Sequence, residues 1–163
     1  MSDARRRRRS LGPILGVAAA AAGGGLVQAR PGTQSWFRTL RKPPLQPPDQ
    51  VFGPVWSVLY TGLAANGIRL FTRDSTDEVR SARRLWVAQL ALNGAWTPIF
   101  FGLRRPLPAL VDLVALDATT VALRRSTALL DESSRHWALD PYLAWLAFAT
   151  YLNASIVWLN RDR

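Results

Sequence analysis

The chain of 163 residues has no cysteine and a single histidine, His136. Without cysteine there can be no disulfide framework, no thiolate zinc ligand and no cysteine nucleophile. One histidine excludes a pair of imidazole ligands for a metal, and it argues against a serine–histidine catalytic site and against the usual ligation of haem. We therefore expect no metal site and no required cofactor.

Acidic residues are also few. Eleven Asp and Glu stand against 21 Lys and Arg, which gives a formal net charge of +10. The chain shows no glycine-rich phosphate loop, no metal-ligand spacing and no nucleophile elbow. The arginines at residues 5–9 are the kind of cluster that binds nucleic acid. An apolar stretch follows them at once, so we interpret them as a topology determinant beside anionic lipid and expect no nucleic-acid partner.

Most of the chain falls into five apolar stretches. Each has about the 17–25 residues that cross a hydrocarbon core about 30 Å thick. They cover residues 11–29, 51–68, 85–103, 107–123 and 138–159. The alternative, a soluble five-helix bundle, needs a polar face on every helix, yet two of the stretches, 51–68 and 85–103, carry no charge at all. The sequence therefore predicts an all-α membrane protein, a five-transmembrane-helix bundle over residues 11–163 behind a basic N-terminal tail, residues 1–10.

The N-terminal segment has two interpretations. Basic residues followed by an apolar run are typical of a secretory or twin-arginine signal. The apolar run of residues 11–27 is long for a signal, which favours a membrane anchor. With five crossings, 13 basic residues fall on the side of the N-terminus and eight on the other side. The positive-inside rule then predicts a cytoplasmic N-terminus.

The longest connection, residues 30–50, combines aromatic residues with proline. Trp36 and Phe37 precede a proline-rich segment, residues 42–48. Because proline fixes its own φ and restrains the residue before it, we expect this loop to be stiff and extended. A stiff loop with aromatic side chains beside a helix mouth is a candidate lid. The alternative for Trp36 is an interfacial aromatic anchor.

Helical spacing places aromatic and polar side chains on common faces of three predicted helices. An amide without a partner in hydrocarbon costs several kcal/mol, so Gln89 and Asn93 should face the interior of the bundle. Ordinary packing explains any one of these faces alone; together they favour a cavity for a flat, mostly apolar ligand. The three sets are Trp56 with Tyr60; Gln89, Asn93, Trp96 and Phe100; and Tyr142, Trp145, Ala149 and Leu152.

The predicted helix over residues 107–123 carries Asp112 and Asp117. Five residues turn a helix by about 500°, so these carboxylates point about 140° apart and form no dyad. We expect Asp112 to face the bundle and to hydrogen-bond a neighbouring helix as a structural group. A proton relay would need further ionisable residues inside the bundle, and we find none.

Seven blocks of the sequence form a series. They are W-F-x-x-L-x-K-P at 36–43, PP at 47–48, VFGPVWSVLY at 51–60, QLALNGAW at 89–96, PIFFG at 98–102, ALVDL at 109–113 and DPYLAWLAFATYLN at 140–153. In content and order they resemble the translocator protein family, also called tryptophan-rich sensory proteins or TspO/MBR. The resemblance covers about three quarters of the chain.

The resemblance implies five transmembrane helices, a homodimer and a pocket roofed by the first loop. Members of the family bind porphyrins and other tetrapyrroles, and many bind cholesterol or isoquinoline and benzodiazepine-type ligands. This chain departs from the sterol motif at Ala154 and Ser155, so we do not expect sterol specificity. Matching positions imply these ligand-binding residues: Trp36, Phe37, Pro43, Trp56, Tyr60, Asn93, Trp96, Phe100, Trp145, Ala149 and Leu152.

Three functions follow as hypotheses. The first is a tetrapyrrole-binding sensor, scavenger or carrier in the lipid bilayer. The second is an enzyme, because the family has been linked to light- and oxygen-dependent porphyrin breakdown; Trp56 and Trp145 would then be the redox candidates. The third is a transporter, although the sequence shows no inverted repeat. For a homodimer, Gly12 with Gly16, or Ala91 with Ala95, would permit close approach of helices.

Overall fold

The computed structural model describes residues 3–30, 32–130 and 139–162, with side chains from Leu11 onward. Arg135 and His136 lie outside the described residues, as do the side chains of residues 5–9. The described part of the chain is all-α, with no strand. Its elements are α1 (Asp3–Gln28), α2 (Thr33–Thr39), α3 (Asp49–Thr72), α4 (Asp77–Thr97), a π-helical turn η1 (Pro98–Gly102), α5 (Pro106–Leu130) and α6 (Asp140–Leu159).

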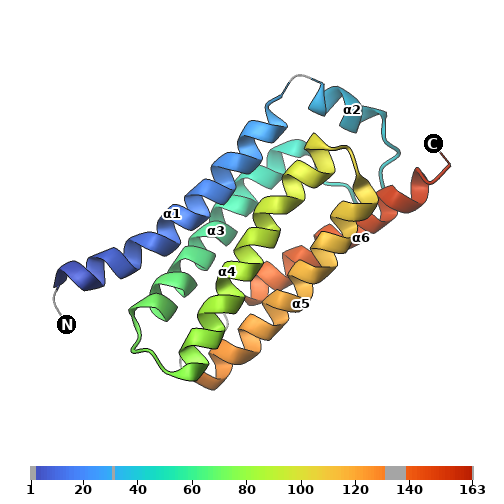
Figure 1. Cartoon of the computed structure of the whole chain (residues 1–163). Helices are drawn as coiled ribbons and strands as arrows, with labels where there is room; N and C mark the ends of the chain where they lie inside the picture. Colours follow the sequence, from blue (N-terminus) through green and yellow to red (C-terminus); the bar gives the residue numbers. More distant parts are fainter. Residues whose placement is uncertain (1–2, 31, 131–138, 163) are drawn as a thin grey trace.

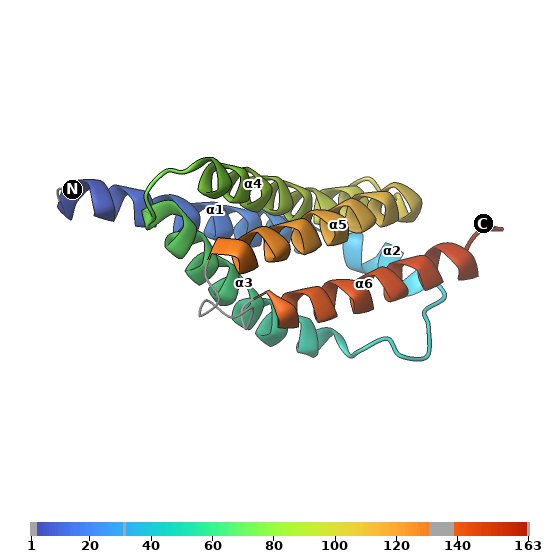
Figure 2. The ribbon, with the colours of Figure 1, turned by 90° about the horizontal axis from the view of Figure 1, so that it is seen from below.

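The five long helices run alongside one another, and α2 lies at the end of the bundle opposite the N-terminus (Figure 1). Helix α1 packs on α3 and α4, α4 packs on α5, and α5 packs on α6. Seen from below, α1, α4 and α5 form one layer, with α3 and α6 on the same side of it (Figure 2). Helices α3 and α6 therefore stand at the two ends of this packing series and face each other.

Three helical segments of the described chain are long and apolar enough to cross a membrane: Leu11–Gln28 in α1, the whole of α5 and the whole of α6. Many of their apolar side chains are exposed, among them Leu15, Leu26 and Val111. Exposed leucine and valine along a bundle suit lipid rather than water. The fold is thus that of an all-α membrane protein.

Helix α4 begins eight residues before the predicted start at residue 85. Its first two turns hold charged residues, which the apolar pattern assigns to a loop. Thr76 caps the helix by accepting a hydrogen bond from the Val79 amide at 3.3 Å. Arg83 then donates to the carbonyls of Leu70 at 3.0 Å and Arg73 at 2.8 Å, where α3 ends. Only Val79 and Ala82 of this segment are buried apolar residues, so capping and the Arg83 bonds stabilise a helical start with a narrow apolar face.

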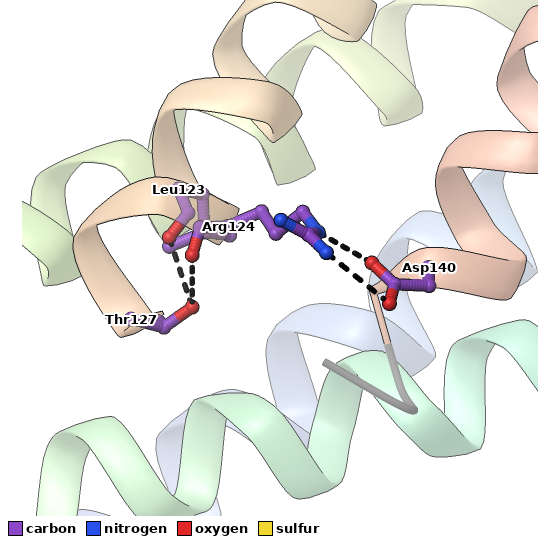
Figure 3. Close-up of polar contacts among 4 residues, drawn as sticks. All are labelled: Leu123, Arg124, Thr127 and Asp140. Carbon is purple, nitrogen blue, oxygen red and sulfur yellow. Dashed lines mark hydrogen bonds and ion pairs between the residues drawn. The ribbon is translucent and has the colours of Figure 1, made fainter. Parts of the chain in front are cut away.

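Helix α5 likewise extends past its predicted end at residue 123. Its last two turns carry Arg124 and Thr127. The Arg124 guanidinium pairs with the Asp140 carboxylate at the start of α6, and the Thr127 hydroxyl donates to the carbonyls of Leu123 and Arg124, both at 3.0 Å (Figure 3). An arginine at the end of a membrane helix can thus remain in the helix, because its charge is balanced by the next helix.

The sequence predicts an extended loop over residues 30–50, and this prediction is wrong for the first part of the connection. Residues Thr33–Thr39 form α2, which begins after Gly32 in the left-handed region at φ 86°. The proline-rich segment, which is irregular, follows only from Lys42 onward. Helix α2 forms because spacing of three to four residues turns Thr33 and Phe37 to one buried side.

A close approach of three helices depends on Gly67 in α3. A Cβ atom at this position would lie 2.6 Å from Cζ2 of Trp86 in α4 and 2.8 Å from Cβ of Pro13 in α1. Trp86 is 3% exposed, and its indole Nε1 donates to the Leu63 carbonyl at 3.1 Å. The absence of a side chain at Gly67 therefore lets the indole ring seat against the α3 backbone.

We predict that Gly67→Ala lowers the midpoint of thermal unfolding in detergent. Overpacking of a tight core typically costs about 1–3 kcal/mol. Trp86 would have to leave its position, so its fluorescence should also change. The transition can be followed by tryptophan fluorescence and by circular dichroism at 222 nm.

The matched control is Gly23→Ala in α1, where an added Cβ meets nothing within 4 Å. This substitution should leave the midpoint unchanged or raise it slightly, because alanine favours a helix over glycine. Equal midpoints for the two variants would contradict the packing assigned to Gly67.

Candidate functional site

A cavity of about 360 Å³ lies between α3 and α6, with α4 and η1 forming its wall. Helix α2 and the segment after it bound one end through Phe37 and Gln46. Ligand pockets in proteins have volumes of about 300–1,000 Å³. This cavity is therefore large enough for a small organic ligand.

Trp56 of α3 is at the centre of an aromatic cluster in the cavity wall. Its ring centroid lies 5.1 Å from that of Tyr60, and 6.4 Å from those of Tyr142 and Trp145. Phe52 packs edge-on against Trp145 at 5.8 Å. Aromatic side chains of α3 and α6 thus meet across the cavity, where the two helix backbones stay apart.

A second aromatic cluster lies beneath α2. Trp96 and Phe100 stack with centroids 5.0 Å apart, and Phe37 contacts Phe100 at 6.1 Å. Phe100 belongs to η1, and it is buried with 2% exposure. The ammonium of Lys42 lies 4.4 Å from the Phe37 ring centroid, in a cation–π contact. The end of the cavity is thus closed by aromatic packing between α2 and η1.

Hydrogen bonds connect three helices behind the aromatic wall. The Tyr60 hydroxyl donates to Asn93 Oδ1 at 2.9 Å, and Asn93 Nδ2 donates to the Tyr142 oxygen at 2.8 Å. Tyr142 in turn donates to Gln89 Oε1 at 3.3 Å. These side chains come from α3, α4 and α6, so the bonds hold the three helices in register around the cavity.

Asn153 of α6 makes a second polar connection. Its Oδ1 accepts from the Trp96 indole at 3.1 Å, and its Nδ2 donates to the Pro106 carbonyl at 2.8 Å. The side chain therefore links α4, α6 and the start of α5. Because Trp96 is held by its indole nitrogen, its ring presents a fixed face to the cavity.

The structure corrects the role expected of Asp112. Its Oδ2 is buried and has no hydrogen-bond partner among the described residues. The bond to a neighbouring helix is made by Asp117 instead, whose Oδ2 accepts from the Thr150 hydroxyl of α6 at 2.7 Å. The reason is positional: Asp117 lies opposite a hydroxyl donor on α6.

The segment after α2 is tied to the end of α6 by one amide. The Arg41 backbone N–H donates to Asn160 Oδ1 at 3.0 Å, and Asn160 Nδ2 donates back to the Arg41 carbonyl at 3.0 Å. The same Nδ2 also contacts the Ile156 carbonyl at 2.8 Å. This reciprocal pair joins positions 119 residues apart and fixes the segment just before Lys42 and Pro43.

Comparison with known proteins is consistent with this architecture. The model of the TspO/MBR family matches residues 14–159. The chain belongs to the TspO/MBR family. It is similar to the translocator protein of Homo sapiens, with 42% identity over 124 residues, which cover 72% of this chain and 70% of the relative.

The chain is also similar to proteins of two other organisms. The translocator protein homolog of Schizosaccharomyces pombe is 36% identical over 127 residues, which cover 76% of this chain and 77% of the relative. The tryptophan-rich protein TspO of Archaeoglobus fulgidus is 35% identical over 149 residues, 90% of this chain and 94% of the relative. With its apolar helices, family membership establishes the chain as a multi-pass integral membrane protein.

The structure brings most of the predicted site residues of this TspO/MBR chain together. Two of the eleven lie outside the cavity wall: Trp36 packs edge-on against Phe100 at 5.7 Å, and Pro43 is buried in the following segment. Gln89 lies behind the wall. The predicted residues that line the cavity are Phe37, Trp56, Tyr60, Asn93, Trp96, Phe100, Trp145, Ala149 and Leu152.

Several lining residues were missed by the sequence reasoning. Phe52 is four residues before Trp56 and Asn153 is four residues after Ala149, so helical spacing was a usable signal for both. Gly24 and Gly25 of α1 had no such signal, since they end a long run of small residues over residues 16–25. They line the cavity because α1 packs between α3 and α4.

We predict that Asn160→Ala frees the segment around Arg41. The variant loses both hydrogen bonds to the Arg41 backbone, each worth about 1 kcal/mol. The Arg41 amide should then exchange its hydrogen at least about tenfold faster, as measured by hydrogen–deuterium exchange with mass spectrometry.

Asn160→Asp is the matched control. It keeps an oxygen to accept from the Arg41 N–H and loses the two bonds that Nδ2 donates, to the Arg41 and Ile156 carbonyls. The Arg41 amide should therefore remain largely protected in this variant. Unchanged exchange in Asn160→Ala would show that the amide does not hold the segment.

Proposed function

We propose that this TspO/MBR protein binds a flat, mostly apolar ligand of the tetrapyrrole type in the cavity, and acts as a sensor, scavenger or carrier. One observation carries the proposal: Trp56, Trp145 and Asn93, from three different helices, border the same cavity. Indole faces stack on planar rings, and a single amide orients the guest. The resemblance to a porphyrin-binding family supports this choice of ligand.

We further propose that all five long helices cross the bilayer. Helices α3 and α4 have 24 and 21 residues, so each is more than about 30 Å long, the thickness of the hydrocarbon core. Both run alongside α1, α5 and α6 (Figure 1). The excess of basic residues on one side supports a cytoplasmic N-terminus as part of this proposal, under the positive-inside rule.

The proposal includes a homodimer, as the family resemblance implies. Of the small residues considered for its interface, Gly16 already faces Leu90 of α4, since an added Cβ would lie 3.1 Å from that side chain. Ala91 of α4 is exposed. The outer face of α4 is therefore the better candidate for the dimer contact.

We predict that Trp56→Phe and Trp145→Phe each weaken protoporphyrin IX binding by about 3- to 10-fold. Loss of an aromatic pair contact costs about 0.5–1.5 kcal/mol. The dissociation constant can be measured in nanodiscs from porphyrin fluorescence and from quenching of the remaining tryptophans.

Trp158→Phe is the control, because Trp158 is 66% exposed, lies near the C-terminus and is absent from the cavity wall. It should bind porphyrin like the wild type. If all three variants bind porphyrin with the affinity of the wild type, the ligand does not occupy this cavity and the proposal is wrong.

An enzymatic role is the second candidate, favoured by the contact between Trp56 and Trp145 at 6.4 Å. Two indoles in contact with a bound porphyrin are positioned for photo-oxidative chemistry. Illumination in air should then give a new absorbing product with wild type and none with the double Trp→Phe variant. A product that forms equally in both would remove the enzyme and leave only binding.

A further inference from the structure

Behind the cavity, four side chains form a continuous series of hydrogen bonds. It runs from Tyr60 through Asn93 and Tyr142 to Gln89, with distances of 2.9, 2.8 and 3.3 Å. Tyr60 and Asn93 border the cavity. Tyr142 and Gln89 lie behind them, both with 0% exposure. The series thus connects the cavity wall to a fully buried amide.

Every bond in this series points away from the cavity. The Tyr60 proton is committed to Asn93, so its oxygen offers the cavity only lone pairs. At the far end Gln89 accepts from Tyr142, and its own Nε2 is buried without an acceptor among the described residues. A buried N–H without a partner is costly, and such groups are rare in native proteins.

Rotation of two amides reverses the series. A turn of 180° exchanges the oxygen and nitrogen of Asn93 and of Gln89, whose shapes are otherwise the same. Gln89 Nε2 then donates to Tyr142, Tyr142 donates to Asn93 Oδ1, and Asn93 Nδ2 donates to the Tyr60 oxygen. Gln89 Oε1 then takes the unpaired position at the buried end that Nε2 held before. A buried carbonyl oxygen without a partner is tolerated better than a buried N–H. The Tyr60 hydroxyl keeps its proton and can now donate it in a hydrogen bond to a group in the cavity.

We propose that the series reverses when a ligand brings a hydrogen-bond acceptor to Tyr60, so that this hydroxyl donates to a carbonyl or imine-type nitrogen on the ligand. With the direction seen in the structure, the same oxygen accepts from an N–H of a ligand. Gln89, which does not line the cavity, is the positioning residue that keeps both directions open. The inference rests on the proposed function, since it concerns the polar wall of the same cavity.

Three tricyclic probes of nearly equal shape test this proposal. Fluorene carries no hydrogen-bonding group, fluorenone carries an acceptor and carbazole carries a donor. Their affinities are measured by displacement of protoporphyrin IX from the full chain in nanodiscs. In the wild type, fluorenone and carbazole should each bind roughly fivefold tighter than fluorene, the ratio that one net hydrogen bond gives.

Tyr60→Phe should abolish both advantages, so that the three probes bind this variant with nearly equal affinity. The carbonyl stretch of bound fluorenone should lie at lower frequency in the wild type than in this variant. Tyr151→Phe is the control, because Tyr151 is exposed on α6 and outside the cavity wall. It should preserve both advantages and the infrared shift.

Gln89→Met separates a positioning role from packing. Without Gln89, Tyr142 can still donate to Asn93, so the direction that serves fluorenone persists. The opposite direction leaves the Tyr142 proton without an acceptor, so carbazole should lose its advantage while fluorenone keeps it. A merely structural loss would weaken all three probes alike, and that result would overturn the role of Gln89.

Equal affinities of the three probes in the wild type, or advantages that survive Tyr60→Phe, would overturn the inference. If porphyrin binding still depends on Trp56 and Trp145 in that case, the proposed function stands and only the reversible series is wrong. If porphyrin binding is insensitive to those tryptophans, the site itself is wrong and the inference falls with it.

Discussion

Polar side chains that face the interior of a membrane bundle must find partners within it, and this constraint organises the structure around α4. Hydrocarbon offers no hydrogen bonds, so Gln89 and Asn93 can be accommodated only where other helices supply donors and acceptors. Tyr60 and Tyr142 supply them from α3 and α6. The helix register that brings the two tyrosine hydroxyls to these amides also places Trp56 and Trp145 across from each other, and the cavity forms between them.

The same constraint explains how the roof of the cavity is held. Aromatic packing between α2 and η1 covers one end, and the Asn160 amide completes the backbone bonds of Arg41. An irregular segment beside a membrane has unpaired backbone groups, and a side-chain amide can both donate and accept. The segment that covers the cavity is therefore hydrogen-bonded to α6 at Arg41, while Phe37 of α2 is held by its aromatic contact with Phe100.

Much of this architecture could be predicted from the sequence. Apolar stretches of about 20 residues predict the long helices, and helical spacing places Trp56 with Tyr60 and Asn93 with Trp96. The first turns of α4 were not predicted, because charged residues surround their two buried apolar side chains, Val79 and Ala82, and Thr76 and Arg83 supply the hydrogen bonds that stabilise them. The hydrogen-bond partners between helices could not be predicted from the sequence either. Which aspartate meets Thr150 depends on the offset between α5 and α6, which sequence spacing within one helix does not contain.

The central claim is that Trp56, Trp145 and Asn93 surround one chamber that receives a planar guest. A crystal structure of the chain with bound protoporphyrin IX tests it most directly. The account predicts density for the macrocycle between the two indoles, with one edge at Asn93 and Tyr60. Density on the lipid-facing surface, with the chamber empty, would contradict it.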